Sequence, residues 1–469
     1  MLNDYSIPTK LQQLISSDQA FHYRIVPIDE DNGTLIFKTD QVDLDSLFSE
    51  LKIVLDRQVK LETCGKQELQ DYLTTNYRRA ENVNKGNLSY TPDFLEKILL
   101  TAKVVGSSDI HFEPYETRCR IRFRLDGKLV EQFNIPIHEY PVIINKIKIR
   151  ADLDISEKRL PQDGRITMKS DLDEFDIRVS SLPTLFGEKI VLRILSKDTA
   201  ALDITDLGFT NDELRIYKEA LRKPSGIILI SGPTGSGKTT TLYATLKLMN
   251  TGDTNILTIE DPIEYTLEGI NQVQLRENIG LDFTKALRTF LRQDPNIIMV
   301  GEIRDVQTAN MAIRTALIGR LVLSTIHTNS AWATISRLID MGIPSFLIAT
   351  TLNLSVAQRL VRKLCEHCKQ RERVSMDLFP EGFVLPITMT EHFKAIGCTK
   401  CHHTGYQGRK AIYEIIPITK ELVQLIKNNA LEIDDYLEEN EIITLGQNAL
   451  EMVEAGETTI EEVYSLLTP

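Results

Sequence analysis

The chain has 469 residues, of which 42% are hydrophobic and 26% are charged, with 24 glycines and 17 prolines. This composition is that of an ordinary packed protein and excludes collagen-like and wholly disordered chains. At roughly 150 residues per domain, the length predicts about three domains. The net charge is −12, and twelve of the acidic residues lie in residues 421–469. The rest of the chain is nearly neutral, which argues against direct electrostatic binding of nucleic acid or anionic lipid.

Two features of the sequence predict a cytoplasmic location. The N-terminal residues 1–16 have neither a basic start nor an apolar run followed by small residues, so we expect no secretory signal. The longest uncharged stretch, residues 341–358, contains too many Gly, Pro and polar residues to cross a bilayer as a helix. We therefore expect any contact with a membrane to go through a partner.

Short strand-like runs and one helical pattern predict a small α/β domain over residues 1–80. The strand-like runs lie at residues 23–28 and 34–39, and residues 44–54 carry apolar side chains at helical spacing. Polar residues then dominate, so residues 81–92 are interpreted as a linker.

The following segment, residues 93–205, predicts an α+β domain. A helix through Phe94, Ile98 and Leu99 precedes several alternating patterns, and Asp126 with Gly127 has the composition of a hairpin turn. The strand patterns lie at residues 109–113, 120–133, 164–170 and 174–182.

Residues 206–362 alternate apolar strands with amphipathic helices, which predicts a parallel sheet with helices on both faces. Paired cysteines interrupt this pattern in residues 363–415, and residues 416–469 have the pattern of acidic helices. The apolar strands are expected at residues 227–231, 255–259, 296–300 and 321–325.

A phosphate-binding pattern, Gly-x4-Gly-Lys-[Ser/Thr], lies between the first of these strands and a helical run. Glycines let backbone N–H groups face phosphates, Lys238 reaches the outer phosphates, and Thr239 can bind Mg²⁺. A glycine-rich loop without this function would rarely combine the pattern with both flanking elements. The nucleotide-binding candidates are Gly232, Pro233, Thr234, Gly235, Ser236, Gly237, Lys238, Thr239 and Thr240.

Acidic residues follow two other predicted strands, at the edge where open parallel sheets bind their ligands. Glu302 follows the strand at 296–300, and the strand at 255–259 is followed by Glu260, Asp261 and Glu264. Gly301 stands where many P-loop enzymes carry a metal-binding Asp. Either the acidic cluster holds the metal, or Thr239 and ordered water do.

His327 follows the strand at 321–325 and is expected to contact the γ-phosphate of a bound nucleotide. A lone histidine at a strand end is more often a satisfied edge residue, but three polar strand ends that converge on one phosphate loop favour the functional interpretation. Arg288 and Arg292 are four residues apart, so we expect them to share a helix face and supply positive charge. Their alternative is an ordinary solvated face.

Two Cys-x-x-Cys pairs predict a structural zinc site, because four thiolates complete a tetrahedral shell and leave no position for substrate. Four reduced cysteines without metal are the alternative. The neighbouring histidines are not expected to bind the ion. The candidate ligands are Cys365, Cys368, Cys398 and Cys401.

With these segments identified, the chain resembles the secretion ATPase superfamily of type II secretion and type IV pilus assembly. The likeness runs from about residue 100 to 415. It rests on SSDIHFEP at 107–114, LPQDGRI at 160–166, GPTGSGKTTTLY at 232–243, TIEDPIEY at 258–265, LRQDPNIIMVGEIRD at 291–305 and STIHTNSA at 324–331. It implies a RecA-like P-loop ATPase domain preceded by a PAS-like α+β domain and a small N-terminal α/β domain, with a tetracysteine zinc module and a helical C-terminus.

The resemblance also implies roles for individual residues. Glu302 is then the catalytic glutamate of an atypical Walker B motif, and His327 and Glu260 are further catalytic residues, in a His box and an Asp box. Asp261 and Glu264 are expected to bind Mg²⁺ with Thr239. The resemblance implies a homo-hexamer in which arginines of the α+β domain, Arg165 and Arg178, complete a neighbour's site. Arg288 and Arg292 match the catalytic arginine pair that precedes the Walker B strand.

The implied function is a hexameric ATPase, at the cytoplasmic side of the inner membrane, that hydrolyses Mg²⁺-bound ATP to drive pilus or pseudopilus assembly. The implied partners are an inner-membrane platform protein, which the zinc module contacts, and a membrane-anchored docking protein. Two alternatives are a motor for a DNA-uptake pilus or a DNA-translocating hexamer, and a nucleotide-dependent scaffold without turnover. The near-neutral body and the single tryptophan, Trp332, argue against direct DNA contact.

Overall fold

The computed structural model describes residues 5, 7–15, 17–31, 33–41, 43–55, 57–77, 86–87, 91, 93–170, 173–195, 203–383, 389–430 and 432–468. Most of the predicted linker at 81–92 lies outside these residues, as do residues 196–202 at the end of the predicted α+β domain. The chain forms two compact units, each built from segments that are distant in sequence. The first comprises Met1–Asn84, Lys363–Gln407 and Leu450–Pro469, and the second comprises Lys85–Arg362 and Gly408–Ala449.

The N-terminal part of the first unit is a three-stranded sheet with helices, of which β1, β2 and α3 correspond to the two strand-like runs and the helical pattern of the sequence. The strands, in the order β1-β2-β3, are β1 (Ile25–Asp31), β2 (Thr34–Thr39) and β3 (Gln58–Thr63). The helices are α1 (Thr9–Gln12), α2 (Ser17–Tyr23), α3 (Leu44–Leu55) and α4 (Lys66–Asn76). Leu35 and Phe37 of β2 are fully buried with Leu51 of α3 and Leu69 of α4, which gives this sheet a core of its own.

The second unit begins with a seven-stranded sheet in the order β4-β7-β6-β5-β10-β9-β8. Asp126 and Gly127 have φ values of 45° and 86°, which the predicted two-residue hairpin turn between β6 and β7 requires. The strands are β4 (Gly86–Asn87), β5 (Asp109–Pro114), β6 (Cys119–Leu125), β7 (Lys128–Ile135), β8 (Gln162–Ser170), β9 (Asp173–Thr184) and β10 (Gly187–Leu195).

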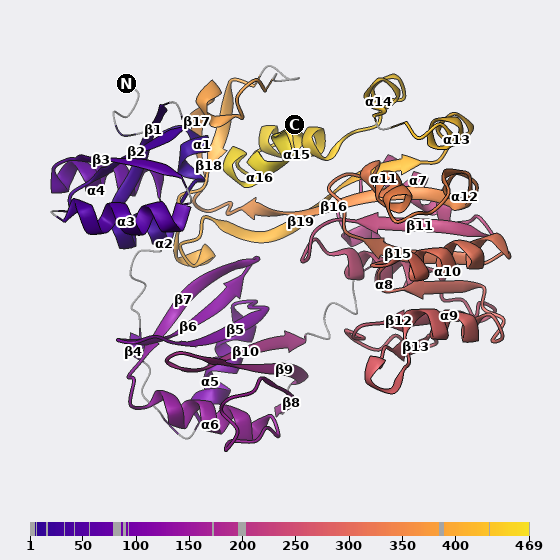
Figure 1. Cartoon of the computed structure of the whole chain (residues 1–469), viewed down its shortest axis with the longest axis horizontal. Helices are drawn as coiled ribbons and strands as arrows, with labels where there is room; N and C mark the ends of the chain where they lie inside the picture. The colour runs from indigo at the N-terminus through magenta and orange to yellow at the C-terminus, as the bar shows by residue number, and fades with distance from the viewer. Residues whose placement is uncertain are drawn as a thin grey trace. The chain divides into compact units, whose positions relative to one another are not determined.

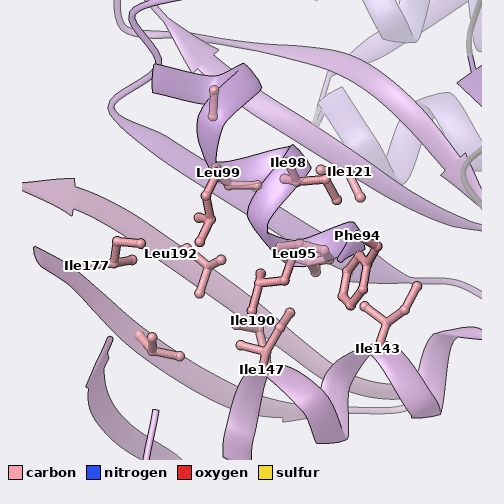
Figure 2. Close-up of a cluster of buried hydrophobic side chains, with 14 of the residues drawn as sticks. Phe94, Leu95, Ile98, Leu99, Ile121, Ile143, Ile147, Ile177, Ile190 and Leu192 are labelled. Atoms are coloured by element: carbon pink, nitrogen blue, oxygen red, sulfur yellow. The ribbon is translucent and has the colours of Figure 1, made fainter. Parts of the chain in front are cut away.

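Two helices, α5 (Phe94–Val104) and α6 (Tyr140–Arg150), supply the other half of this domain's core. Figure 2 shows Leu95 and Ile98 of α5 and Ile147 of α6 gathered with Ile190 and other strand residues. The opposite face of the sheet is polar because side chains alternate along each strand, as in β6, where every second residue is buried.

The rest of the second unit is built on a sheet in the order β13-β12-β14-β15-β11-β16-β19 (Figure 1). Its strands are β11 (Gly226–Ser231), β12 (Ile256–Glu260), β13 (Asn271–Gln274), β14 (Ile297–Val300), β15 (Leu321–Ile326), β16 (Leu352–Leu364) and β19 (Tyr406–Pro417). β11 pairs in parallel with β15 and β16, and β14 pairs in parallel with β12 and β15. This confirms the four predicted strands and their parallel arrangement.

Helices connect these strands, as the alternating pattern predicted. They are α7 (Asn211–Leu221), α8 (Lys238–Met249), α9 (Phe283–Phe290), α10 (Val306–Leu317), α11 (Ala333–Asp340) and α12 (Ser345–Thr351). The apolar core of this part gathers side chains such as Ile228, Leu246, Leu323 and Val356 from the strands and from α8.

The cysteine-containing segment and the C-terminal helices are divided between the two units. β17 (Gln370–Arg373) pairs with β18 (Glu391–Lys394). Residues 408–415, which are predicted to belong to the cysteine-containing module, lie in β19 of the sheet that contains β11. The C-terminal residues form the expected helices α13 (Lys420–Lys427), α14 (Asp434–Glu439), α15 (Leu445–Glu454) and α16 (Ile460–Leu467). Within the described part of the chain, no helix is long and apolar enough to cross a membrane.

Candidate active site

The phosphate loop lies between β11 and α8, where the sequence predicts it. Gly232, Gly235 and Gly237 all have positive φ, at 149°, 82° and 88°, so the backbone turns in a way that favours glycine. A Cβ at Gly232 would lie 2.5 Å from the carbonyl oxygen of Gln358, so the loop is packed closely against β16. The tip of the loop, Pro233 to Gly235, is exposed.

Gln358 of β16 forms hydrogen bonds with the phosphate loop and with α8. The sequence patterns did not predict this role. Its side chain is 2% exposed, its Nε2 donates to the carbonyl of Ser236 at 2.9 Å, and its Oε1 accepts from the Thr241 hydroxyl at 2.9 Å. A polar residue inside an otherwise apolar strand is the signal that could have identified it, because buried polar groups need fixed partners.

Lys238 and the hydroxyl residues beside it are placed to meet phosphates. The Lys238 ammonium donates to the carbonyls of Gly232 and Pro233 at 2.8 and 3.0 Å. Burial lowers the pKa of Lys238, and the negative charge of Glu302 acts in the opposite direction. Thr239 is exposed and Thr240 is half-buried. The Ser236 hydroxyl is buried without a hydrogen-bond partner among the described residues.

Glu302 and His327 are brought together at the ends of the adjacent strands β14 and β15, and β15 in turn pairs with β11. The Glu302 side chain is 16% exposed, and its Oε2 lies 3.4 Å from Nε2 of the more exposed His327. The two side chains therefore meet at the edge of the sheet that also carries the phosphate loop, as the spacing predicted. Their catalytic roles stay predictions.

Arg304 is an unforeseen member of this group. It forms an ion pair with Oε1 of Glu302, and its NH1 lies 3.9 Å from Oδ2 of Asp261. The hydrogen bond to Glu302 raises the pKa of Arg304. Arg304 thus links the acids that follow β12 and β14. The available signal was a basic residue set between acids in GEIRD, a pattern that a solvated surface also produces.

The three acids after β12 have different environments. Glu260 is 3% exposed, and its oxygens accept hydrogen bonds from Thr258, Gln272 and Tyr243; the Thr258 and Gln272 bonds measure 2.6 and 3.1 Å. Asp261, in contrast, has a side chain that is 43% exposed. The structure therefore buries Glu260 among neutral donors and leaves Asp261 open.

The third acid of this cluster, Glu264, is bound by an arginine of the α+β domain. NH1 of Arg178 lies 3.2 Å from Oε2 of Glu264, and NH2 donates to the carbonyl of Ile263 at 2.6 Å. Strand register places Arg178 opposite Arg165 in β8 and opposite Arg193 in β10. Arg193 was not foreseen because residues 187–195, which form β10, were not among the predicted strands.

Arg165 and Arg193 each pair with an acid of their own domain, Arg165 with Asp176 and Arg193 with Asp109 at 2.9 Å. Register alone therefore brings the three arginines together across β8, β9 and β10, and only Arg178 contacts the acidic cluster after β12.

The expectation that Arg288 and Arg292 share a helix face needs a correction. α9 ends at Phe290, so Arg292 lies in the turn after it. The residue before a proline avoids the α conformation, and Asp294, which precedes Pro295, has a φ of 48°. Both arginines are exposed, and Arg292 donates to the carbonyl of Arg288 at 3.2 Å, which keeps them adjacent.

A pocket of about 420 Å³ opens beside the phosphate loop. Gly232 and Pro233 form one wall, His327 and Asn329 form another, and residues of α11, including Arg337, complete the lining. The first turn of the phosphate loop and the histidine loop after β15 therefore face a shared space that can accept part of a nucleotide.

The four predicted cysteines form a cluster in which the sulfur atoms all lie within 4.8 Å of one another. Their Sγ atoms are 3.9 Å apart for Cys365 and Cys398 and 3.8 Å apart for Cys368 and Cys401. Backbone hydrogen bonds from Cys401 and Lys400 contribute to a pKa of about 7 for Cys398, which favours the thiolate that binds metals. Gly397 and Gly405 also direct N–H groups at cluster sulfurs.

Comparisons with known proteins identify the family. Residues 85–465 match the family described as "Type II/IV secretion system protein", and residues 1–83 match the MshEN domain. The type IV pilus assembly ATPase PilB of Pseudomonas aeruginosa is 48% identical over 79% of this chain and 66% of that protein. PilB of Myxococcus xanthus is 40% identical over the whole chain and 88% of that protein.

A type II secretion protein and a solved structure extend this result. The type II secretion system protein E of Aeromonas hydrophila is 36% identical over 98% of both chains. The crystal structure of the pilus retraction motor PilT with bound ADP has a TM-score of 0.54 and 25% identity, and the match covers 80% of this chain and 96% of that one. The chain therefore belongs to the type II/IV secretion system protein family and is a secretion ATPase.

Proposed function

We propose that the chain hydrolyses Mg²⁺-bound ATP and that the reaction drives the assembly of pilus or pseudopilus subunits. The observation that carries the proposal is the position of Glu302. Its Oε2 lies 3.4 Å from Nε2 of His327, and its negative charge acts to raise the pKa of Lys238. A carboxylate beside the lysine of the phosphate loop is placed to orient an attacking water. The assembly role is supported by the names of the relatives.

The residues of the loop fit a nucleoside triphosphate with Mg²⁺. The Ser236 hydroxyl has no hydrogen-bond partner among the described residues, and Thr239 is exposed, so both can meet a phosphate or its metal ion. Gly232 is packed so closely that a side chain at this position would not fit the loop. Thr239 would hold Mg²⁺, with Asp261, Glu264 or ordered water as further ligands. Bound there, Mg²⁺ supplies positive charge that offsets the charge of the phosphates.

Glu302 accepts a hydrogen bond from the attacking water and aligns it with the γ-phosphorus. As the new P–O bond forms and the bond to ADP breaks, the water proton passes to Glu302. Lys238 balances charge on the outer phosphates, and His327, next to Glu302, contacts the γ-phosphate. Arg304 holds the other oxygen of Glu302 and so fixes the direction in which the carboxylate points.

The catalytic role predicted for Glu260 is supported only as a positioning role. Its oxygens are occupied by Tyr243, Thr258 and Gln272, so it fixes the strand end from which Asp261 projects. Asp261, which is exposed and 3.9 Å from Arg304, is the better candidate for Mg²⁺ in this cluster.

A homo-hexamer is the proposed assembly, with the α+β domain acting as the PAS-like domain of the family. Arg165 and Arg178 are then the arginines that supply positive charge to the phosphates of a neighbour, and Arg288 and Arg292 are the pair before β14 that supplies further positive charge. The exposed side chains of Arg165, Arg288 and Arg292 support this role. Arg178 contacts Glu264 of its own chain, so its role requires that this ion pair open in the assembly.

The tetracysteine cluster is proposed to hold structural Zn²⁺, and its surface to contact an inner-membrane platform protein. Residues 1–83 are proposed to dock on a membrane-anchored partner. The chain then works at the cytoplasmic face of the inner membrane. The net charge of −12 supports contact through protein partners rather than with anionic lipid or nucleic acid.

Phosphate release by the purified chain in Mg²⁺ and ATP tests the enzymatic part. Lys238→Ala removes the charge that meets the outer phosphates, and we expect it to lower the rate by about 100-fold or more. Lys247→Ala, at the exposed end of the same helix, is the matched control and should retain the parent rate. Parent-like release by Lys238→Ala would contradict the proposal.

Deletion of the gene in its own host tests the assembly part. Wild-type chain, but not Lys238→Ala, should restore surface filaments if the product is a pilus, or protein export if it is a pseudopilus. Measuring filaments, export and DNA uptake together separates the candidate machines. A deletion strain that retains all three activities would contradict the assembly role.

A further inference from the structure

Glu414 of β19 is a buried acid outside the phosphate site. Glu414 is 5% exposed, and both of its carboxylate oxygens accept hydrogen bonds. Oε1 accepts from the backbone N–H of Ala331 at 2.6 Å, and Oε2 accepts from the backbone N–H of Leu445 at 3.3 Å. One side chain therefore joins two segments that are 114 residues apart in sequence.

Ala331 ends the loop that begins at His327. The same loop is held at two more points, because Arg359 donates to the carbonyl of Asn329 at 2.7 Å and Ser355 donates to the carbonyl of Ala331 at 2.7 Å. Together with the Ser231 hydroxyl, which donates to the carbonyl of Ser330 at 3.4 Å, Glu414 is thus one of several polar side chains that set the position of the loop carrying the histidine next to Glu302.

Leu445 is the first residue of α15, so the second oxygen of Glu414 lies at the N-terminal end of a ten-residue helix. The first oxygen lies just before α11, which begins at Ala333. Two helix N-termini therefore converge on one carboxylate, and both favour negative charge. Burial raises the pKa of Glu414, while the two N–H bonds and the charge of Arg359 act against this.

The amide of a glutamine has one acceptor oxygen and an NH₂ group that can only donate, whereas a carboxylate presents a separate acceptor oxygen to each of the two N–H groups. Because the oxygens are rigidly joined, a shift of the histidine loop changes the bond to α15, and a shift of α15 changes the bond to the loop.

We propose that Glu414 is a positioning residue that couples the His327 loop to helix α15, so that nucleotide at the phosphate loop and the C-terminal segment respond to each other. The proposal deepens the proposed function and rests on it, since it requires a chain that binds and hydrolyses ATP.

Two variants separate coupling from simple support. Glu414→Gln has nearly the same shape, but its NH₂ group faces one of the two N–H donors, so one bond is lost. Asn448→Ala is the control, because Asn448 Nδ2 donates to the carbonyl of Tyr413 at 2.9 Å and ties α15 to β19 without touching the histidine loop. Each full-length variant is first compared with wild type by thermal unfolding.

Three readouts are taken with and without a non-hydrolysable ATP analogue and Mg²⁺. They are phosphate release, hydrogen exchange of residues 441–455, and fluorescence of Trp332. Trp332 is the only tryptophan of the sequence and lies three residues after Asn329. In wild type, we expect the analogue to slow exchange in α15 and to change the Trp332 emission. Trp332 is 6% exposed and directly follows Ala331, so it reports on the loop itself.

In Glu414→Gln, we expect kcat to fall about tenfold with KM for ATP changed by less than about twofold, and the α15 response to the analogue to disappear. Asn448→Ala should retain kcat and the Trp332 response, even if α15 exchanges faster throughout. A Glu414→Gln protein that retains both kcat and the α15 response would overturn the inference. So would equal losses in both variants. Wild-type chain without any hydrolysis would instead contradict the proposed function.

Discussion

At the scale of single residues, the buried carboxylate of Glu260 depends on neutral donors, and Tyr243 supplies one of them. We expect Tyr243→Phe to lower the unfolding free energy of the ATPase part by about 2 kcal/mol, because a hydrogen bond to a charged buried group is lost. Tyr217→Phe is the matched variant, since it removes a hydrogen bond between neutral hydroxyls, to Thr245 at 2.8 Å, and should cost about 1 kcal/mol. Urea unfolding measures both values, and an equal or reversed order would contradict this account.

The lowered pKa of Glu113 in β5 should make the stability of the protein depend on pH. Burial alone would raise the pKa of Glu113, but hydrogen bonds from Arg122 and Lys189 lower it from 4.5 to about 2. Because the folded-state pKa is the lower one, this contribution to stability is complete above pH 4.5 and is lost as the pH falls toward 2. Glu113→Gln should cost about 3 kcal/mol at neutral pH and flatten the loss of stability below pH 4.5.

The control for Glu113 is Glu116→Gln, in the exposed turn after β5. It should leave both the stability and its acid dependence unchanged. Unfolding free energies measured between pH 7 and pH 3 decide the matter, and an unchanged acid slope in Glu113→Gln would show that other groups cause it.

The sequence was a good guide to residues whose chemistry is local. The phosphate loop was identified because glycines, Lys238 and the flanking elements lie in one short segment. Glu302 and His327 were predicted to meet because adjacent parallel strands end at the same edge. Arg304, Gln358 and Tyr243 were missed because their partners lie on other strands and helices, and only the folded sheet shows which polar side chains face one another.

At the scale of elements, the tetracysteine cluster has the clearest consequence. We expect about one zinc ion per chain, and Cys398→Ser should remove most of it because a hydroxyl is a poor fourth ligand. Loss of the ion should make residues 363–407 sensitive to protease, since two short strands bury little apolar surface of their own. Cys64→Ser, outside the cluster, should retain the full zinc content. Mass spectrometry of the metal checks both variants, and a zinc-free wild type would contradict the site.

Elements with a simple period were predicted well, and those that depend on context were not. β6 alternates buried and half-buried residues and is visible in the sequence. β16 and β19 were missed because buried strands in a parallel sheet lack alternation, as in residues 411–416, which are all buried. The end of α9 was placed too late because the effect of Pro295 on the preceding turn was not considered.

At the scale of the whole molecule, the grouping of distant segments could not be read from the sequence. The N-terminal sheet forms one unit with the cysteine segment and the last helix. The contacts within that unit include an exposed one, in which Gln13 donates to the carbonyl of Glu461 at 3.3 Å, and a buried one between the hydroxyls of Tyr406 and Thr459 at 2.8 Å. Polar side chains of this kind have no sequence pattern that names their partners, so the predicted linear domain order stays a prediction.

The central claim for the molecule is that side chains from adjacent strand ends cleave a nucleotide held by the phosphate loop. Steady-state phosphate release and ATP affinity of Glu302→Gln test it most directly, with Glu219→Gln on the exposed face of α7 as the control. We predict that Glu302→Gln binds ATP with the affinity of wild type but releases phosphate at a rate lower by about 100-fold or more, because the water is no longer oriented. Wild-type turnover by Glu302→Gln would contradict the claim.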